Sequence, residues 1–395
     1  MDRSIRKSIY VNELNYVMQL SKITDDKRSR IIPELFENPQ AEKIYLLKEE
    51  IRTLAELENR IKKIIDQQDG VSALLNIFSV TDDLVIPSEL REVLFSNVKL
   101  VFFIGAGISK LLEVPLWADL ANNVINHLKE NSDLNHTEAI RLQDERYTSR
   151  QIISIFHQVI KDRNKIKNFY EKYLVGQGNK NGNPYELLFE LEEALAKPVL
   201  KISTNIDLEW EKILRRKADK QKQDQSREGQ TSSAPVCYDK SQYENFQFDQ
   251  EITSNILYQI HGSMHNLDTA VMTTSQYVNN YRDEKGLRGF LEKIFKENIV
   301  LFIGSGMQEF EIIEHCLRQS PFKHFALVGT RVGEENLFRI KRAYFSEINI
   351  KALPYYLDFQ GYDRLLFVLR SWADEVKSAK KKQFYEDIKL IDEVL

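Results

Sequence analysis

The sequence is short of cysteine, with only Cys237 and Cys316 among its 395 residues. Two cysteines cannot build a disulfide framework or a four-cysteine zinc site, so a reducing compartment is expected. No apolar run approaches the roughly 18 residues of a membrane span, and the first residues lack the apolar segment of a signal peptide. The sequence therefore predicts a soluble, cytoplasmic protein that does not enter a membrane.

A strong excess of charge of either sign is also missing, since 55 Lys and Arg stand against 59 Asp and Glu, for a formal net charge of −4. A dedicated nucleic-acid binder would carry a broad basic field, so direct nucleic-acid binding is not expected. Hydrophobic residues make up 42% and charged residues 29% of the chain. These are ordinary globular values, and the length predicts two or three structural units.

Residues 1–95 are rich in charge and helical periodicity, and they predict a helical accessory or assembly region. Apolar residues recur there at alternating three- and four-residue spacings: Ile44, Leu47, Ile51, Leu54, Ile61 and Ile65. Such a seam buries one face of a helix against another helix. Packing within the same domain is the simpler interpretation. Assembly of a homo-oligomer, or docking of a partner, is the alternative.

A doubly wound, Rossmann-like α/β domain with a parallel sheet is predicted for residues 96–395. Apolar, partly β-branched runs predict buried strands at 98–104, 199–203, 299–303 and 325–328, with a weaker one at 348–353. Helical stretches between these runs predict right-handed crossovers. Residues 115–196 predict a helical insert, and the polar tract 215–235 predicts a mobile surface loop.

The strongest local signal is the turn Gly105–Ser109 (GAGIS), directly after the first predicted strand. Gly105 and Gly107 would let the backbone approach a pyrophosphate, and Ser109 can cap the helix that follows. A merely tight strand-to-helix turn is the alternative. The third glycine of a GxGxxG fingerprint is missing, because Leu111 and Leu112 occupy its neighbourhood. This absence disfavours a nicotinamide-dependent oxidoreductase.

Three further segments follow predicted strands, at the edge where open α/β sheets bind ligands. In the first, STNID at 203–207, Asn205 could hold a ribose hydroxyl or a water. An Asx turn with Asp207 as helix cap is the alternative there. The second is a short predicted strand that runs into a glycine turn, YQIHGS at 258–263. His261 is placed there as a general base, although a lone histidine is commonly structural. The third is a second glycine turn at 302–306, and two such turns suggest two edges of one dinucleotide.

Together these segments resemble the bacterial sirtuin-like proteins that hydrolyse NAD⁺ in antiphage defence. The resemblance covers about residues 96–372, through GAGxS at 105–109, Pro-x-Trp at 115–117, T-N-x-D at 204–207, H-G-S at 261–263, T-x-x-x-Y ending at Tyr277, and F-I-G at 302–304. It implies that Asn205 and His261 are the catalytic pair, while Asp207 stabilises the developing cation or caps its helix. The residues expected to hold the dinucleotide are Gly105, Ala106, Gly107, Ser109, Trp117, Thr204, Gly304 and Ser305.

The resemblance implies NAD⁺ as the substrate, hydrolysed to nicotinamide and ADP-ribose. Protein-deacylating sirtuins carry a four-cysteine zinc module that Cys237 and Cys316 cannot build, so no zinc is expected and deacylation is disfavoured. The resemblance also implies a HerA-type hexameric ATPase as partner, since this sequence lacks a GxxxxGK[ST] motif of its own. Ser305 and Gly306 depart from the family's aromatic-Ser pair. A non-catalytic NAD or ADP-ribose binding module that regulates assembly with a partner ATPase is the alternative function.

Overall fold

The computed structural model describes residues 82–394 apart from gaps at 132, 145–146, 180, 217–235, 239–255, 265, 283–285, 308, 320–322, 332–333 and 358–360. The apolar seam predicted between residues 44 and 65 lies outside the described residues. So does most of the loop predicted at 215–235. Both remain predictions.

A seven-stranded sheet with the order β3-β4-β2-β1-β5-β6-β7 forms the centre of the fold. Its strands are β1 (Leu100–Ile104), β2 (Val199–Ser203), β3 (Val236–Tyr238), β4 (Ile256–Gln259), β5 (Ile299–Ile303), β6 (His324–Thr330) and β7 (Ile350–Tyr356). The pairs from β3 through to β6 are all parallel. Every residue of β1, β2 and β5 is buried, as apolar runs in a sheet covered on both faces require.

Helices connect these strands, which confirms the predicted doubly wound α/β fold. They are α6 (Ser88–Phe95), α7 (Ala106–Lys110), α8 (Trp117–Glu130), α9 (His136–Asp144), α10 (Ser149–Ile160), α11 (Arg163–Tyr173), α12 (Pro184–Leu195), α14 (Thr274–Arg282), α15 (Leu287–Glu297), α16 (Phe310–Gln319), α17 (Glu335–Glu347) and α18 (Arg364–Val394). Short 3-10 helices occur at η1 (Asp82–Leu84) and η3 (Gly361–Asp363).

The order of the strands reverses direction between β1 and β5. From β1 the chain moves outward to β2 and β4, and it then returns to place β5 on the other side of β1. Pairing in register brings Ile104 opposite both Ser203 and Ile303, so the three strands end level with one another. The carboxyl edge at such a reversal is where open α/β sheets bind ligands.

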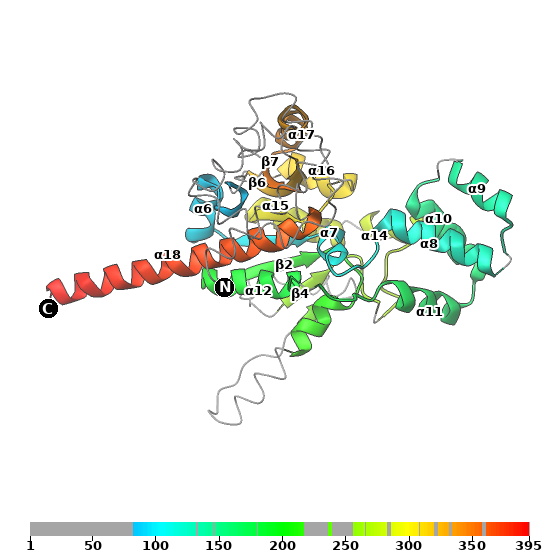
Figure 1. Ribbon diagram of the computed structural model, residues 1–395, viewed down its shortest axis with the longest axis horizontal. Helices are drawn as coiled ribbons and strands as arrows, with labels where there is room; N and C mark the ends of the chain where they lie inside the picture. The colour runs from blue at the N-terminus through cyan, green and yellow to red at the C-terminus, as the bar shows by residue number, and fades with distance from the viewer. Residues whose placement is uncertain are drawn as a thin grey trace, which may run out of the picture. The chain divides into compact units, whose positions relative to one another are not determined.

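Residues 115–196, predicted as a helical insert, contain α8 to α12. Figure 1 shows α8, α9, α10 and α11 gathered as one group next to α14, to one side of the strands. An aromatic cluster joins three of these helices, with the Phe156 and Phe169 ring centroids 4.7 Å apart and the His127 ring 5.1 Å from Phe169. The last helix, α12, instead packs toward β2, where its Glu192 accepts hydrogen bonds from the fully buried Lys201 at 2.7 Å.

The described residues form two compact units. The smaller unit comprises residues 82–87, 328–343 and 353–372. Within it, Asp83 accepts hydrogen bonds from Arg364 at 2.7 and 2.9 Å and from the Tyr356 backbone at 3.0 Å. The larger unit contains the other described residues, including α6 to α16 and strands β1 to β5.

Two strands, β3 and β7, differ most from the sequence prediction. The three-residue β3, at Val236–Tyr238, was not expected, because three residues are too few to show a periodicity. The last strand, β7, covers 350–356 rather than 348–353 and includes Pro354. A proline is tolerated there because β7 ends the sheet order, so one side of its backbone has no strand to pair with among the described residues.

Candidate active site

Four neighbouring strands end in the residues that the sequence singled out. β1 leads into Gly105, β2 into Thr204 and Asn205, β4 toward His261, and β5 into Gly304. Because these strands are parallel and adjacent, their carboxyl ends lie at one edge of the sheet. The structure therefore brings the two predicted catalytic residues and both glycine turns together, all within the larger unit.

The Asn205 side chain is held in one orientation. Its Nδ2 has three acceptors within hydrogen-bond distance, which its two N–H groups share: the Gly105 carbonyl at 3.0 Å, the Ser109 hydroxyl at 2.8 Å and the Tyr185 hydroxyl at 3.1 Å. Its Oδ1 is buried and has no hydrogen-bond partner among the described residues. Buried amide oxygens are nearly always hydrogen-bonded, so Oδ1 is available to a ligand.

Asp207 and Ser109 form a buried pair behind Asn205. The Ser109 hydroxyl donates to Asp207 Oδ2 at 2.6 Å and lies 2.8 Å from the Tyr185 hydroxyl. Ser109 lies in the last turn of α7 and does not form the helix cap that the sequence suggested. Asp207 Oδ1 accepts from the Glu209 backbone at 3.0 Å, which is the local turn given above as the alternative. Burial raises the pKa of Asp207 to about 6, and the hydrogen bond from Ser109 opposes this rise.

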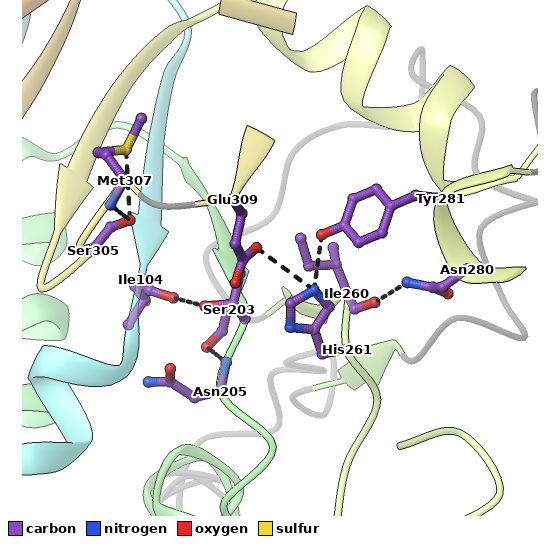
Figure 2. Close-up of polar contacts among 11 residues, drawn as sticks. Ile104, Ser203, Asn205, Ile260, His261, Asn280, Tyr281, Ser305, Met307 and Glu309 are labelled. Atoms are coloured by element: carbon purple, nitrogen blue, oxygen red, sulfur yellow. Dashed lines mark hydrogen bonds and ion pairs between the residues drawn. The ribbon is translucent and has the colours of Figure 1, made fainter. Parts of the chain in front are cut away.

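His261 is 1% exposed and is held from the α14 side. Its Nε2 lies 2.8 Å from the Tyr281 hydroxyl and 3.8 Å from Glu309 Oε2, as Figure 2 shows. The Tyr277 ring lies 5.6 Å from the imidazole, edge to face. The other ring nitrogen, Nδ1, is buried and has no hydrogen bond of normal geometry among the described residues, although the Thr204 backbone lies close enough to the ring to favour its protonated form. It is the second buried polar atom in the site that can accept a ligand or a proton.

The pKa of His261 is lowered to about 3, mainly by burial and further by the positive charge of Arg150, while the Thr204 backbone opposes the shift. The motif alone predicts an imidazole of ordinary pKa. Burial instead keeps the ring neutral in mildly acidic solution as well. A neutral imidazole can accept a proton, but its low pKa makes it a weak base until something raises it.

The two glycine turns pack directly against each other. The Gly107 amide donates to the Gly304 carbonyl at 2.8 Å, and the Gly105 amide donates to the Ile303 carbonyl at 2.9 Å. A Cβ atom on Gly107 would lie 2.7 Å from the Gly304 oxygen, and Gly304 itself has φ +66. Close packing of the two turns therefore requires these glycines. The hydrogen bonds between the turns also occupy two backbone amides that could otherwise donate to a bound phosphate.

The remaining predicted binding residues divide into two groups. Ala106, Thr204 and Ser305 are half-buried and belong to the strand-end turns; the Thr204 amide donates to the Ile104 carbonyl at 3.1 Å. The Ser305 hydroxyl accepts from the Met307 amide at 3.3 Å. Trp117 is different. It begins α8 and takes no part in the hydrogen bonds of the site among the described residues.

Four residues that contact Asn205 or His261, or lie beside them, belong to no sequence motif: Tyr185, Tyr281, Glu309 and Arg150. Tyr281 follows Tyr277 by four residues in α14, so helical periodicity could have placed both on one face. Tyr185 and Arg150 come from α12 and α10, helices that precede β2 in the chain. No motif links such residues to a strand end, so only the folded chain shows their proximity.

The described part of the chain shows neither a metal-ligand cluster nor a membrane-spanning helix. None of its groups of three or more His, Cys, Asp or Glu side chains is arranged to hold a metal ion. None of its helices is both long enough and apolar enough to cross a membrane.

Comparison with known families gives one match. Residues 199–353 match the SIR2-like domain. The matched segment includes Asn205, His261 and Gly304, whereas the first glycine turn precedes it. A search of curated proteins found no match to the chain. The match supports a sirtuin-like assignment for this part of the chain and an NAD-related function.

Proposed function

We propose that this chain is an NAD⁺ glycohydrolase, which cleaves NAD⁺ to nicotinamide and ADP-ribose. The observation that carries the proposal is a pair of buried acceptor atoms, Asn205 Oδ1 and His261 Nδ1, at neighbouring strand ends, neither with a hydrogen bond of normal geometry in the described part of the chain. An enzyme that positions a hydroxyl or a water and removes its proton needs such a pair of acceptors. The match to the SIR2-like domain supports the dinucleotide as the ligand.

Bound NAD⁺ supplies a glycosidic bond whose cleavage releases neutral nicotinamide, while water adds to the ribose carbon and loses a proton to give ADP-ribose. Asn205 Oδ1 would accept a hydrogen bond from a ribose hydroxyl or from that water, because its Nδ2 is fixed by three acceptors. His261 Nδ1 would take the proton. A placed general base contributes about 100-fold to 10,000-fold in rate.

Asp207 has a supporting role in this proposal. Its two oxygens are bound to the Ser109 hydroxyl and the Glu209 amide, so it fixes the turn that carries Asn205. Its carboxylate would also favour positive charge developing on the ribose. With a pKa of about 6, it is mostly ionised at neutral pH.

The wider role that we propose is NAD⁺ depletion in bacterial antiphage defence, leading to abortive infection. The protein would act in the cytoplasm as a homo-oligomer, beside a HerA-type hexameric ATPase and without zinc. This proposal is supported by the combination of sequence motifs that resembles such defence proteins.

The test is release of nicotinamide from NAD⁺ by the purified chain, with and without the partner ATPase. Asn205→Ala and His261→Ala are each expected to lower the rate by about 100-fold or more. His157→Gln is the matched control, because His157 is a histidine whose Nε2 lies 2.7 Å from the Tyr170 hydroxyl in the helical insert. Full activity in either folded site variant would disprove the catalytic assignment.

A second function is favoured by one observation. The pKa of about 3 makes His261 a weak base in the ligand-free state. A module that binds NAD or ADP-ribose without cleaving it, and so regulates assembly with a partner ATPase, would need the two acceptor atoms but no base. It predicts ADP-ribose binding without nicotinamide release, even when the partner is present.

A further inference from the structure

We propose that Arg150 binds the diphosphate of the dinucleotide, from a helix that none of the sequence motifs includes. The inference rests on the proposed function and names a binding residue for the same site. Three observations support it: the position in which α10 holds the Arg150 guanidinium, the contact of this guanidinium with Tyr277, and the lack of an acceptor for its N–H groups among the described residues.

The position of Arg150 is fixed by the start of α10. Thr148 caps this helix by accepting from the Gln151 amide at 3.3 Å, and Gln151 returns a hydrogen bond to the Thr148 amide at 2.8 Å. One turn further along, Ser154 accepts from the Thr274 amide at 2.9 Å. That bond joins α10 to the start of α14, the helix that carries Tyr277 and Tyr281. The first turn of α10 is therefore anchored beside the residues that hold His261.

The guanidinium lies over the Tyr277 ring, 3.4 Å from its centroid. The Tyr277 ring in turn contacts His261, and its centroid lies 4.7 Å from that of the tilted Tyr281 ring. A guanidinium that stacks through its face leaves its five N–H donors directed outward from the edge of the plane. Arg150 is thus part of the aromatic wall around His261, with its donors available to another group.

No carboxylate pairs with Arg150 among the described residues, and none of them accepts a hydrogen bond from its side chain. Other arginines in the same unit do have acidic partners: Arg163 with Asp268, Arg216 with Glu186 and Arg288 with Glu314. The first turn of α10 also lacks an acidic residue. A half-buried cation at the positive end of a helix, with no carboxylate partner in the part of the chain that the structure describes, favours an anion beside it.

The diphosphate is the anion that fits this position. The glycine turns already use the Gly105 and Gly107 amides in contacts with β5 and its turn, so these amides cannot neutralise it. Arginine suits the task because its planar donors match phosphate oxygens two at a time. The Glu309 carboxylate lies 3.8 Å from His261 Nε2, on the Tyr281 side of the ring. A bound diphosphate would also offset the positive charge that helps to lower the pKa of His261, so substrate binding would make the base stronger.

The experiment measures ADP-ribose affinity by calorimetry for wild type, Arg150→Gln, Arg150→Lys and the control Arg282→Gln. Arg282 is an exposed arginine at the end of α14. Arg150→Gln is expected to weaken ADP-ribose binding by about 10- to 100-fold, the loss typical of a charged hydrogen bond. Lysine should recover part of it, and Arg282→Gln should change nothing. Raising the salt concentration should weaken binding to wild type more than binding to Arg150→Gln.

Truncated substrates separate a phosphate contact from a general structural effect. Cleavage of nicotinamide riboside, which has no phosphate, should be slowed by Arg150→Gln far less than cleavage of NAD⁺, and the change for NAD⁺ should appear in KM. Equal ADP-ribose affinity in wild type and Arg150→Gln would overturn the assignment, as would equal effects on both substrates. Failure of wild type to release nicotinamide from NAD⁺, with or without the partner, would instead refute the proposed function itself.

Discussion

At the scale of single residues, the orientation of Asn205 depends on groups that never need to touch a substrate. The Tyr185 hydroxyl accepts from Asn205 Nδ2 and also lies within hydrogen-bond distance of Ser109. Tyr185 is 1% exposed, and burial holds the pKa of its phenol well above the ordinary range. It therefore stays neutral and can both donate and accept. Tyr185 acts as a positioning residue, which keeps Asn205 Oδ1 turned toward the ligand side.

Tyr185→Phe should consequently lower kcat for NAD⁺ cleavage by about 3- to 30-fold with little change in KM, and lower the free energy of unfolding by about 1 kcal/mol. Tyr170→Phe is the matched control, because it also removes a buried hydroxyl, the one bonded to His157 in the insert. The control should lose similar stability and keep its kcat. Equal kcat values for the two variants would show that the Tyr185 hydroxyl is only structural.

At the scale of elements, the contact between the two glycine turns joins β1 and α7 to the turn after β5. A Cβ atom at position 107 would meet backbone atoms of Gly304, at 2.7 Å from its oxygen and 2.9 Å from its Cα, so no side-chain rotation can relieve the collision. Gly107→Ala should therefore lower the free energy of unfolding by about 1–3 kcal/mol. Chemical denaturation measures this, and an unchanged midpoint would mean that the turns can separate freely.

The elements also show how far the sequence could predict the fold. β1, β2 and β5 were found as apolar runs, because strands buried on both faces leave that pattern in any sequence. The exception within β2, Lys201, is balanced by Glu192 from α12, a pairing that no local pattern reveals. β3 could not be predicted, because three residues are too few to show a strand's alternation of apolar and polar side chains. The carboxyl ends of β1, β2 and β5 could be predicted, whereas contacts between distant helices could not.

The candidate site divides in the same way. Asn205, His261 and the glycines were found because each directly follows a strand, a relation that the sequence itself displays. Tyr185 and Arg150 reach the site from helices α12 and α10, so their roles depend on packing. The structure also gives a different reason for a glycine at position 107. A phosphate approach was expected, whereas the structure shows a neighbouring backbone in the place where a Cβ would lie.

At the scale of the whole molecule, buried histidines should make stability depend on pH. Burial lowers the pKa values of His157 and His324 to about 4, and that of His261 to about 3. In the unfolded chain these groups titrate near about 6.5. Unfolding in mildly acidic solution therefore takes up protons, so their contribution to stability is complete above about pH 6.5 and is lost as the pH falls toward 4. Asp207, whose pKa is raised to about 6, opposes this trend, because its contribution is largest below about pH 4 and is lost as the pH rises through 6.

Three groups that bind protons on unfolding outweigh one that releases a proton, so the melting temperature should fall steadily from neutral pH to about pH 4.5. The double variant His157→Gln, His324→Asn should flatten this dependence, since asparagine can still accept the Val300 amide that donates to His324 Nδ1 at 3.2 Å. His136→Gln, at an exposed histidine on α9, should leave the dependence unchanged. A double variant that loses stability as steeply as wild type would show that acid unfolding arises from other groups.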